Sequence, residues 1–195
     1  TLRELLAVSG LNLRLIVPGT GDALDRPIVW AHLTEILDSR EFSEPGEILL
    51  TIGQNIPLIQ DDADPSLKGI AHECLSLCDN FVAGMLDAGV IGCGFGVGMK
   101  HDKVPSELID AAERRGLPLF LIPREIPFQA IERQVSQSLA EDEYSQLRAS
   151  YSLQRRLIAA ANSDSPVHAI VMKTAESVGG WSAFLGSNGE IVDLS

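Results

Sequence analysis

The chain has 195 residues, of which 45% are hydrophobic and 22% are charged, and this composition excludes wholesale disorder and fibrous repeats. Its 27 acidic residues outnumber its 15 Lys and Arg, and a formal net charge of −12 repels phosphate backbones, so we do not expect this segment to bind DNA or RNA directly. Three cysteines, an odd number in a chain of this size, favour free thiols in a reducing compartment, and we expect a cytoplasmic protein.

The first third of the chain predicts a short helix followed by strands. Thr1 and Glu4 form a capping-box pattern, which predicts a first helix that stops at Gly10. Because the chain opens on Thr instead of Met, we expect a fragment of a longer protein. The segment 34–46 is expected to be helical or turn-like. Runs rich in Ile, Val and Leu, each bounded by Gly or Pro, predict buried strands at 13–17, 28–33 and 47–52.

The next part of the chain alternates helices with strands. A polar segment at 60–66 precedes a helix expected to run to about Ala88, since its acidic residues suit the positive end of a helix dipole. The following elements are a strand that begins at 89–92, a helix over 105–115 with Gly116 past its end, and a last core strand over 117–123. This alternation predicts an α/β fold, with a mainly parallel sheet flanked by helices. The apolar stretch 81–99 contains six glycines and an aspartate, so we expect no membrane span.

From Phe128 onward, apolar residues recur at helical spacing with no Gly or Pro before Pro166. They predict one long helix of roughly thirty residues, about 45 Å, whose apolar stripe must be covered. Packing on its own domain and pairing with the same helix of a second chain both remain open. Pairing favours a homodimer. The residues of the expected dimer helix are Tyr144, Leu147, Tyr151 and Ile158.

The end of the chain predicts the opening of another domain. Residues 167–178 are typical of a helix, and residues 180–195 of a hairpin that turns at Asn188-Gly189 in a two-residue loop. A lone hairpin is marginally stable, so we expect a truncated second domain after the long helix. The predicted organisation is an α/β ligand-sensing domain at 1–126, a connector and dimerisation helix at 127–163, and the truncated domain at 164–195.

Ligands of open parallel sheets bind beyond the carboxyl ends of the strands, and this rule selects the candidate site residues. Glu35 and Arg124 each follow an apolar strand on that side. A carboxylate there can bind amide or amine donors, and a guanidinium can bind a carboxylate or a carbonyl pair. Taken alone, each is better explained as a solvated or paired surface charge, whereas the two together indicate a polar ligand. The candidate ligand-binding residues are His32, Glu35, Thr51, Gly53, Gln54, Gly94, Gly96 and Arg124.

Other chemistry-bearing residues form no recognisable site. The glycine run 92–98, expected to follow the fourth strand, lacks the final glycine of a dinucleotide fingerprint, because Val97 and Met99 occupy that position in the two possible frames. A flexible or tightly packed strand-to-loop turn is favoured over nucleotide binding, and such a turn can still line a small-molecule pocket. Cys74 and Cys78 share a helix face without further zinc ligands and predict buried thiols. We therefore expect no catalytic residues, no metal and no cofactor.

A series of motifs runs in a fixed order through about residues 1–140. They are Asp25–Trp30, Glu35, Pro45–Gly53, Ala88–Gly92, Val104-Pro105 with Leu108-Ile109, Leu117–Pro123, and Ile126-Pro127-Phe128 with Ile131. In this order they resemble the amino-terminal domain of the PucR-type (purine catabolism regulator) transcription factors. The combination of the Pro45–Gly53 and Leu117–Pro123 motifs is fairly specific.

The resemblance implies a bacterial cytoplasmic regulator whose amino-terminal domain senses a small metabolite. Such regulators control the catabolism of nitrogenous compounds, for example purine breakdown products or amino acids. The segment 164–195 would then open a GAF-like middle domain, and no recognition helix is present in this chain. The expected partners are a small-molecule effector, a second copy of the chain, and DNA only through a carboxyl-terminal helix-turn-helix absent from this chain.

Three hypotheses follow. In the first, the sheet domain binds a small polar metabolite and the long helix conveys the change, so the chain is no enzyme. In the second, a small α/β enzyme acting on a phosphorylated or acyl substrate uses Glu35, Cys93 or His32 for proton transfer, although no nucleophile, base and orienter stand at recognisable spacing. In the third, a purely structural dimerisation piece fills the strand-end region with side chains.

Overall fold

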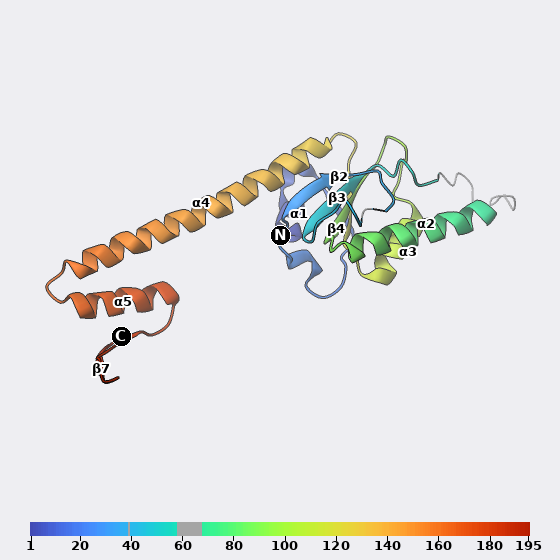
Figure 1. The fold of residues 1–195 in the computed structure, drawn as a ribbon. Helices are drawn as coiled ribbons and strands as arrows, with labels where there is room; N and C mark the ends of the chain where they lie inside the picture. The colour runs from blue at the N-terminus through green and yellow to red at the C-terminus, as the bar shows by residue number, and fades with distance from the viewer. Residues whose placement is uncertain (39, 58–67) are drawn as a thin grey trace. The chain divides into compact units, whose positions relative to one another are not determined.

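The computed structural model describes residues 1–38, 40–57 and 68–195, and the chain divides into two compact units, Thr1–Leu139 and Ala140–Ser195. The acidic segment at 60–66 lies outside the described residues. The elements in chain order (Figure 1) are α1 (Leu2–Ala7), η1 (Ser9–Leu11), β1 (Arg14–Val17), η2 (Ala23–Asp25), β2 (Trp30–Leu33), β3 (Glu47–Thr51), α2 (Lys68–Asp87), β4 (Gly92–Gly96), α3 (Ser106–Arg115), β5 (Leu119–Ile122), α4 (Phe128–Ala161), α5 (Pro166–Val178), β6 (Ala183–Leu185) and β7 (Ile191–Leu194).

The first unit is built on a five-stranded sheet in the order β1-β5-β4-β3-β2. Strands β2, β3, β4 and β5 are parallel, and β1 pairs with β5 in the antiparallel direction at one edge. Every residue of the two inner strands β3 and β4 is buried, as continuous apolar strands require when both faces are covered. This topology confirms the predicted α/β class with a mainly parallel sheet.

Helices cover both faces of this sheet (Figure 1). On one face, Leu2 of α1 and Ile131 and Val135 of α4 are buried in a common core. On the other face, Phe81 of α2 and Leu108 of α3 are buried in a second core. The first turns of α4 are therefore part of the sheet domain's core and hold the start of this helix against the strands.

The glycine run forms strand β4, whereas the sequence analysis placed it after the strand. Gly92, Gly94 and Gly96 alternate along β4 and so share one face of the sheet. A Cβ at Gly94 would lie 2.7 Å from the ring of Phe120, and one at Gly96 would lie 2.8 Å from the ring of Phe128. The glycines are needed because these two rings pack directly on the strand backbone.

Local side-chain bonds decide two further boundaries. The capping box of α1 is confirmed, with the Glu4 N–H donating to Thr1 Oγ1 at 3.3 Å, but α1 ends at Ala7 and not at Gly10. Between β2 and β3 the described residues form turns and bends and no helix. Thr34 Oγ1 accepts from the Ile36 N–H at 3.1 Å, and such local bonds to hydroxyls compete with helix formation.

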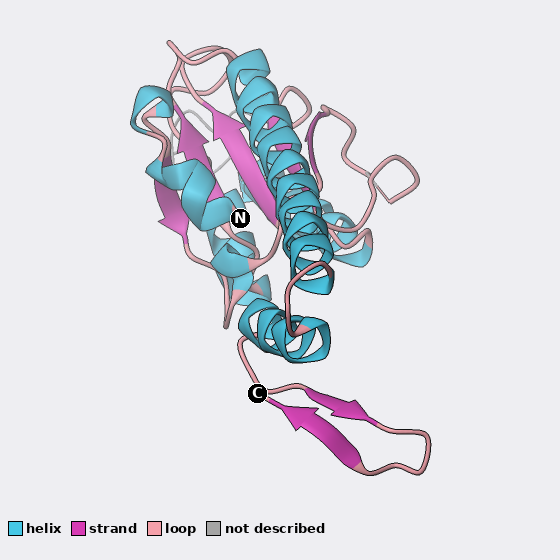
Figure 2. Cartoon of the chain, turned by 90° about the vertical axis from the view of Figure 1, so that its left-hand side faces the viewer, coloured by secondary structure: helices cyan, strands magenta, loops and turns pink. Residues whose placement is uncertain are grey.

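The second unit consists of the later turns of α4, helix α5 and the β6–β7 hairpin, whose strands Figure 2 shows as an antiparallel pair. The hairpin is tied to α5 by two contacts. Ser182 Oγ donates to the Val171 carbonyl at 2.6 Å, and His168 Nδ1 lies 3.0 Å from Asp193 Oδ1. The predicted helix and hairpin of this region are thus present in the structure.

The loop of this hairpin is longer than predicted. The Gly186 N–H donates to the Glu190 carbonyl at 2.9 Å, and the Gly189 N–H donates to the Gly186 carbonyl at 3.0 Å. Gly189 has φ +81°, the left-handed conformation that closes a three-residue loop after a turn. The two-residue turn at Asn188-Gly189 is therefore wrong. Among the described residues, the structure contains no helix with both the length and the apolar character needed to cross a bilayer.

Candidate ligand-binding pocket

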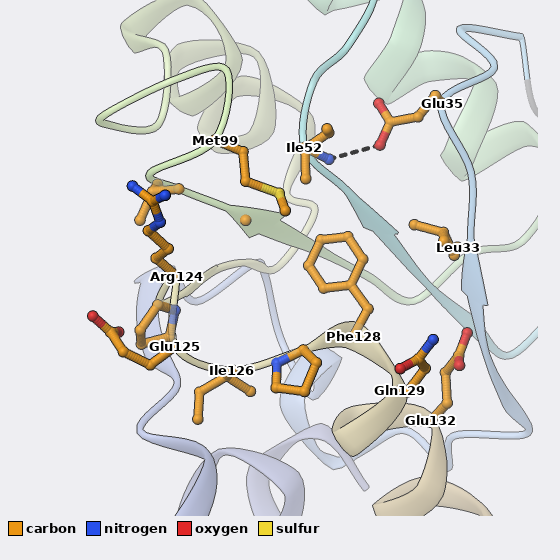
Figure 3. A pocket seen from close by; sticks show the side chains of 14 residues that line it. Leu33, Glu35, Ile52, Met99, Arg124, Glu125, Ile126, Phe128, Gln129 and Glu132 are labelled. Atoms are coloured by element: carbon orange, nitrogen blue, oxygen red, sulfur yellow. Dashed lines mark hydrogen bonds between the residues drawn. The ribbon is translucent and has the colours of Figure 1, made fainter.

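A cavity of about 710 Å³ opens at the carboxyl ends of the parallel strands (Figure 3). We call it the strand-end pocket. Its position agrees with the general rule for ligand sites in open parallel sheets. It is lined by Leu33, Glu35, Ile52, Gly96, Val97, Met99, Pro123, Arg124, Glu125, Ile126, Pro127, Phe128, Gln129 and Glu132.

The segment between β5 and α4 brings the start of α4 to this pocket. Pro123 and Pro127 bracket the segment, and the Ile126 N–H donates to the Pro123 carbonyl at 3.0 Å, which closes a turn. Because Pro127 directly precedes the helix, α4 begins immediately beyond the strand ends. Its lining residues Gln129 and Glu132 lie in the first two turns of the helix.

The walls of the strand-end pocket are mainly apolar. The ring of Phe128 lies in the middle of the view in Figure 3, with Leu33, Ile52 and Met99 around it. Leu33 is 50% exposed and Met99 is 72% exposed, so apolar surface is available to a bound molecule. Apolar walls with a few polar groups at the rim are typical of sites for small organic ligands.

Glu35 holds the loop that follows β3. Its Oε1 accepts from the Ile52 N–H at 2.8 Å, and its Oε2 accepts from the Gln54 N–H at 2.7 Å and from Thr51 Oγ1 at 2.9 Å. The predicted role of a carboxylate that binds amide donors is therefore filled by donors of the protein itself. Since hydrogen bonds to a charged acceptor are strong, Glu35 fixes the edge of the pocket.

Arg124 stands at the opposite side of the pocket opening. Its aliphatic stem packs on Gly98, where an added Cβ would lie 2.9 Å from the Arg124 Cβ and Cδ atoms. Gly98 has φ +82°, and its N–H donates to the His101 carbonyl at 2.7 Å. Within the described part of the chain, the Arg124 guanidinium has no ion pair or hydrogen bond. It is therefore available to a ligand anion.

Three predicted site residues support the loop without lining the pocket. Thr51 is buried, donates to Glu35 and accepts the Gly53 N–H at 3.0 Å. Gly53 has φ +67° and lies beneath the Phe95 ring, while Gln54 uses its backbone N–H to bind Glu35. Their contribution is to position Glu35.

Two other predicted residues lie away from the pocket. His32 has its Nδ1 3.5 Å from Glu47 Oε2, and it alternates along β2 with Leu33, so it faces the opposite side of the sheet. Gly94 is covered by the Phe120 ring. Among the predicted ligand-binding residues, the structure thus places Glu35, Gly96 and Arg124 in the pocket lining.

The comparison with known proteins decides the family of this chain. Residues 4–139 match the model of the purine catabolism regulatory protein-like family. The chain belongs to this family. The match covers all five strands of the sheet and the early turns of α4, so every residue that lines the strand-end pocket lies within it. The resemblance stated from the sequence motifs is confirmed.

The chain is also similar to a curated transcription regulator. It is 30% identical over 143 residues to the transcriptional activator PmfR of Paenarthrobacter nicotinovorans. The aligned part covers 72% of this chain but 26% of the relative, so the similarity concerns about a quarter of that protein's length. No solved structure gives a significant match.

The lining residues that α4 and the neighbouring loops contribute were not among the residues predicted from the sequence. Phe128, Gln129 and Glu132 were assigned only to the connecting helix, and Met99 was not a candidate. The available signal was the Pro123–Pro127 bracket, which places a helix start directly after the last core strand. That signal gives the position of the helix start but not the direction of its side chains.

The cysteines of this family member are structural. Cys74, Cys78 and Cys93 are free and buried, in agreement with the predicted thiols. Burial raises the pKa of the Cys93 thiol to about 12 and also raises the pKa values of Cys74 and Cys78. In the described ranges, no three metal-ligating side chains come together. A protonated thiol in the core is not a nucleophile.

Proposed function

We propose that this chain is the amino-terminal effector-sensing part of a cytoplasmic transcription regulator that controls the catabolism of nitrogenous compounds. Family membership and the likeness to a transcriptional activator support the regulatory role. The observation that carries the sensing role is the lining of the strand-end pocket, which includes Phe128, Gln129 and Glu132 of α4. A bound metabolite contacts the helix that continues out of the sheet domain.

The coupling follows from how α4 is held. The Phe128 ring packs on the backbone of Gly96, and Ile131 and Val135 are buried against the sheet. Close-packed interiors transmit displacement because they have few voids to absorb it. A ligand that favours one position of the first turns of α4 therefore biases the helix, provided that its affinity differs between the two positions.

Binding without turnover is the better proposal for the pocket. The three residues considered for proton transfer are dispersed, because Cys93 is in the core and His32 faces the opposite side of the sheet. Glu35 lines the pocket, but its carboxylate accepts three hydrogen bonds from the neighbouring loop. We assign DNA binding to a carboxyl-terminal domain of the full-length regulator, which is consistent with the net charge of −12 on this chain.

Self-association is proposed through one face of α4, the α4 stripe. Its residues are Tyr144, Leu147, Tyr151 and Ile158, which are exposed by 61%, 52%, 66% and 56%. Their spacings of three, four and seven residues are those of a coiled-coil seam. The same stripe on a second copy is its simplest cover, because the spacing repeats identically on both helices.

Ligand binding is tested by filling the pocket. Leu33→Trp places a larger side chain on the wall of the strand-end pocket, and we expect it to weaken metabolite binding at least tenfold. Calorimetry and thermal shift with purine breakdown products and amino acids measure the effect, since a ligand at 100 times its Kd stabilises a protein by about 2.7 kcal/mol. Leu15→Trp, at a 40% exposed position on β1 outside the pocket, is the matched control. Absence of any shift with the folded full-length regulator would disprove the sensing role.

Dimerisation is tested by introducing a charged residue into the α4 stripe. We expect Leu147→Glu to raise the dimer dissociation constant at least 100-fold, because pairing would bury an unpartnered carboxylate. Analytical ultracentrifugation of the whole chain measures it. Ser145→Glu makes the same charge change at an exposed position that lies off the stripe and should leave the dimer intact. A monomeric parent chain, or equal effects of the two variants, would contradict the proposal.

A further inference from the structure

The strand-end pocket carries opposite charges at its two ends. In Figure 3, Arg124 lies on one side of the Phe128 ring, and Glu132 lies on the other side next to Gln129. The Arg124 guanidinium has no partner among the described residues, as shown above. Glu132 is half-buried, and its carboxylate likewise has no ion pair or hydrogen bond within the described ranges. Each end of the pocket therefore has an uncommitted charged group. At the Arg124 end the neighbouring exposed Glu125 is likewise unpaired among the described residues.

The charges of the lining residues limit which ligands the strand-end pocket can accept. Glu35, Glu125 and Glu132 are acidic lining residues, and Arg124 is the single basic one. A purely anionic ligand would meet an excess of negative charge, even though Arg124 attracts it. A purely cationic ligand would suit Glu132, but where its body covers the exposed Arg124 it would leave that guanidinium without a counter-charge. Covering a charged group without supplying a counter-charge is costly, so both single-charge solutions are poor.

Resting on the proposed function, we propose that the effector is a zwitterion, with a cationic nitrogen at Glu132, a carboxylate at Arg124 and an apolar or flat body against Phe128. A guanidinium can bind a carboxylate with two parallel hydrogen bonds. A cationic nitrogen near the Phe128 face also gains from the ring quadrupole. A cavity of about 710 Å³ falls within the range found for small organic ligands.

The two ends of the pocket belong to different parts of the fold, so a zwitterion bound at both would connect these parts. Arg124 follows β5 and is braced by Gly98, whereas Glu132 lies in the second turn of α4. A two-ended ligand links the strand ends to the helix, whereas a one-ended ligand engages only one of them. The linked state depends most strongly on the position of α4, and this dependence supplies the differential affinity that signalling requires.

Three probes with the same ring test the inference by calorimetry on the whole chain. They are 4-(aminomethyl)benzoate, which carries both charges, 4-methylbenzoate and 4-methylbenzylamine. We expect the first to bind at least tenfold more tightly than either of the others. Arg124→Gln should remove its advantage over the amine, and Glu132→Gln should remove its advantage over the carboxylate. Glu113→Gln, an exposed α3 position outside the pocket, should change neither ratio.

The outcomes separate the inference from the proposed function. If a one-ended probe binds as tightly as the zwitterion, or if a metabolite that binds the pocket lacks one of the two charges, the zwitterion inference is wrong and the sensing role stands. If neither the probes nor the metabolite panel binds the folded full-length regulator, both fail. Comparing probes within one variant makes the ratios insensitive to a partial loss of folded protein.

Discussion

Replacing Gly94 with Val is expected to lower the free energy of unfolding of the sheet domain by about 3 kcal/mol or more, at the upper end of the cost of overpacking. The Cβ would lie 2.7 Å from two atoms of the Phe120 ring and 2.8 Å from Ile122 Cδ1. Both neighbours are fully buried and cannot turn into solvent. Relief requires the strands or the core to move, so the cost is large.

Urea unfolding followed by circular dichroism measures this prediction, with the midpoint and slope analysed together. Gly94→Ala has the same close contacts with fewer atoms and keeps the prediction testable if the Val variant does not fold. Gly10→Ala is the control, because nothing lies within 4 Å of its added Cβ. A Gly94→Val protein within 1 kcal/mol of the parent would mean that the Phe120 ring moves aside easily, and the account of β4 would be wrong.

Replacing Glu35 with Ala is expected to lower the free energy of unfolding by about 2–3 kcal/mol, because three donors lose a charged acceptor. A hydrogen bond to a charged group contributes roughly 1.5–3 kcal/mol, and water that enters the site replaces part of this loss. Two of these donors are the backbone N–H groups of Ile52 and Gln54, at 2.8 and 2.7 Å from the carboxylate. Their hydrogen exchange should accelerate at least tenfold. The ligand affinity should fall with them, because this loop forms the edge of the strand-end pocket.

Amide exchange by nuclear magnetic resonance, combined with chemical unfolding, checks the Glu35 prediction. Glu35→Gln keeps one carbonyl oxygen as an acceptor and should retain part of the stability. Glu125→Ala removes the same charge from an exposed position in the same pocket. We expect it to change the free energy of unfolding by less than about 0.5 kcal/mol, as for ordinary surface substitutions. Equal effects at the two positions would show that the hydrogen bonds of Glu35 do not hold the loop.

These two predictions concern residues that the sequence analysis singled out for other reasons. Gly94 was a candidate ligand residue, and the structure makes it a packing residue beneath Phe120. Glu35 was expected to offer its carboxylate to a ligand, and the structure gives that carboxylate three donors from the protein. For Glu35 the position near the strand ends was predicted correctly, whereas the groups that its carboxylate binds were not. For Gly94 the position was wrong as well, because this residue lies in the middle of β4.

The sequence by itself determined the fold class, the approximate bounds of most described elements and the edge of the sheet where a pocket would lie. Those features depend on short-range causes: apolar strand runs, the Thr1–Glu4 capping box, and the left-handed Gly116 with φ +73° after α3. A residue's neighbours along the chain act in the unfolded polypeptide too, so their effects can be read from the order of residues.

Only the tertiary structure decided which side chains meet at the pocket. Glu35 binds the loop at Thr51–Gln54, Gly96 supports Phe128, and Gly98 supports Arg124, across separations of 16 to 32 residues. Such contacts depend on the twist of the sheet and on the packing of α4 over it. Local residue propensities do not determine either of these. The pocket chemistry, including the uncommitted charges of Arg124 and Glu132, therefore emerged only when distant segments were brought together.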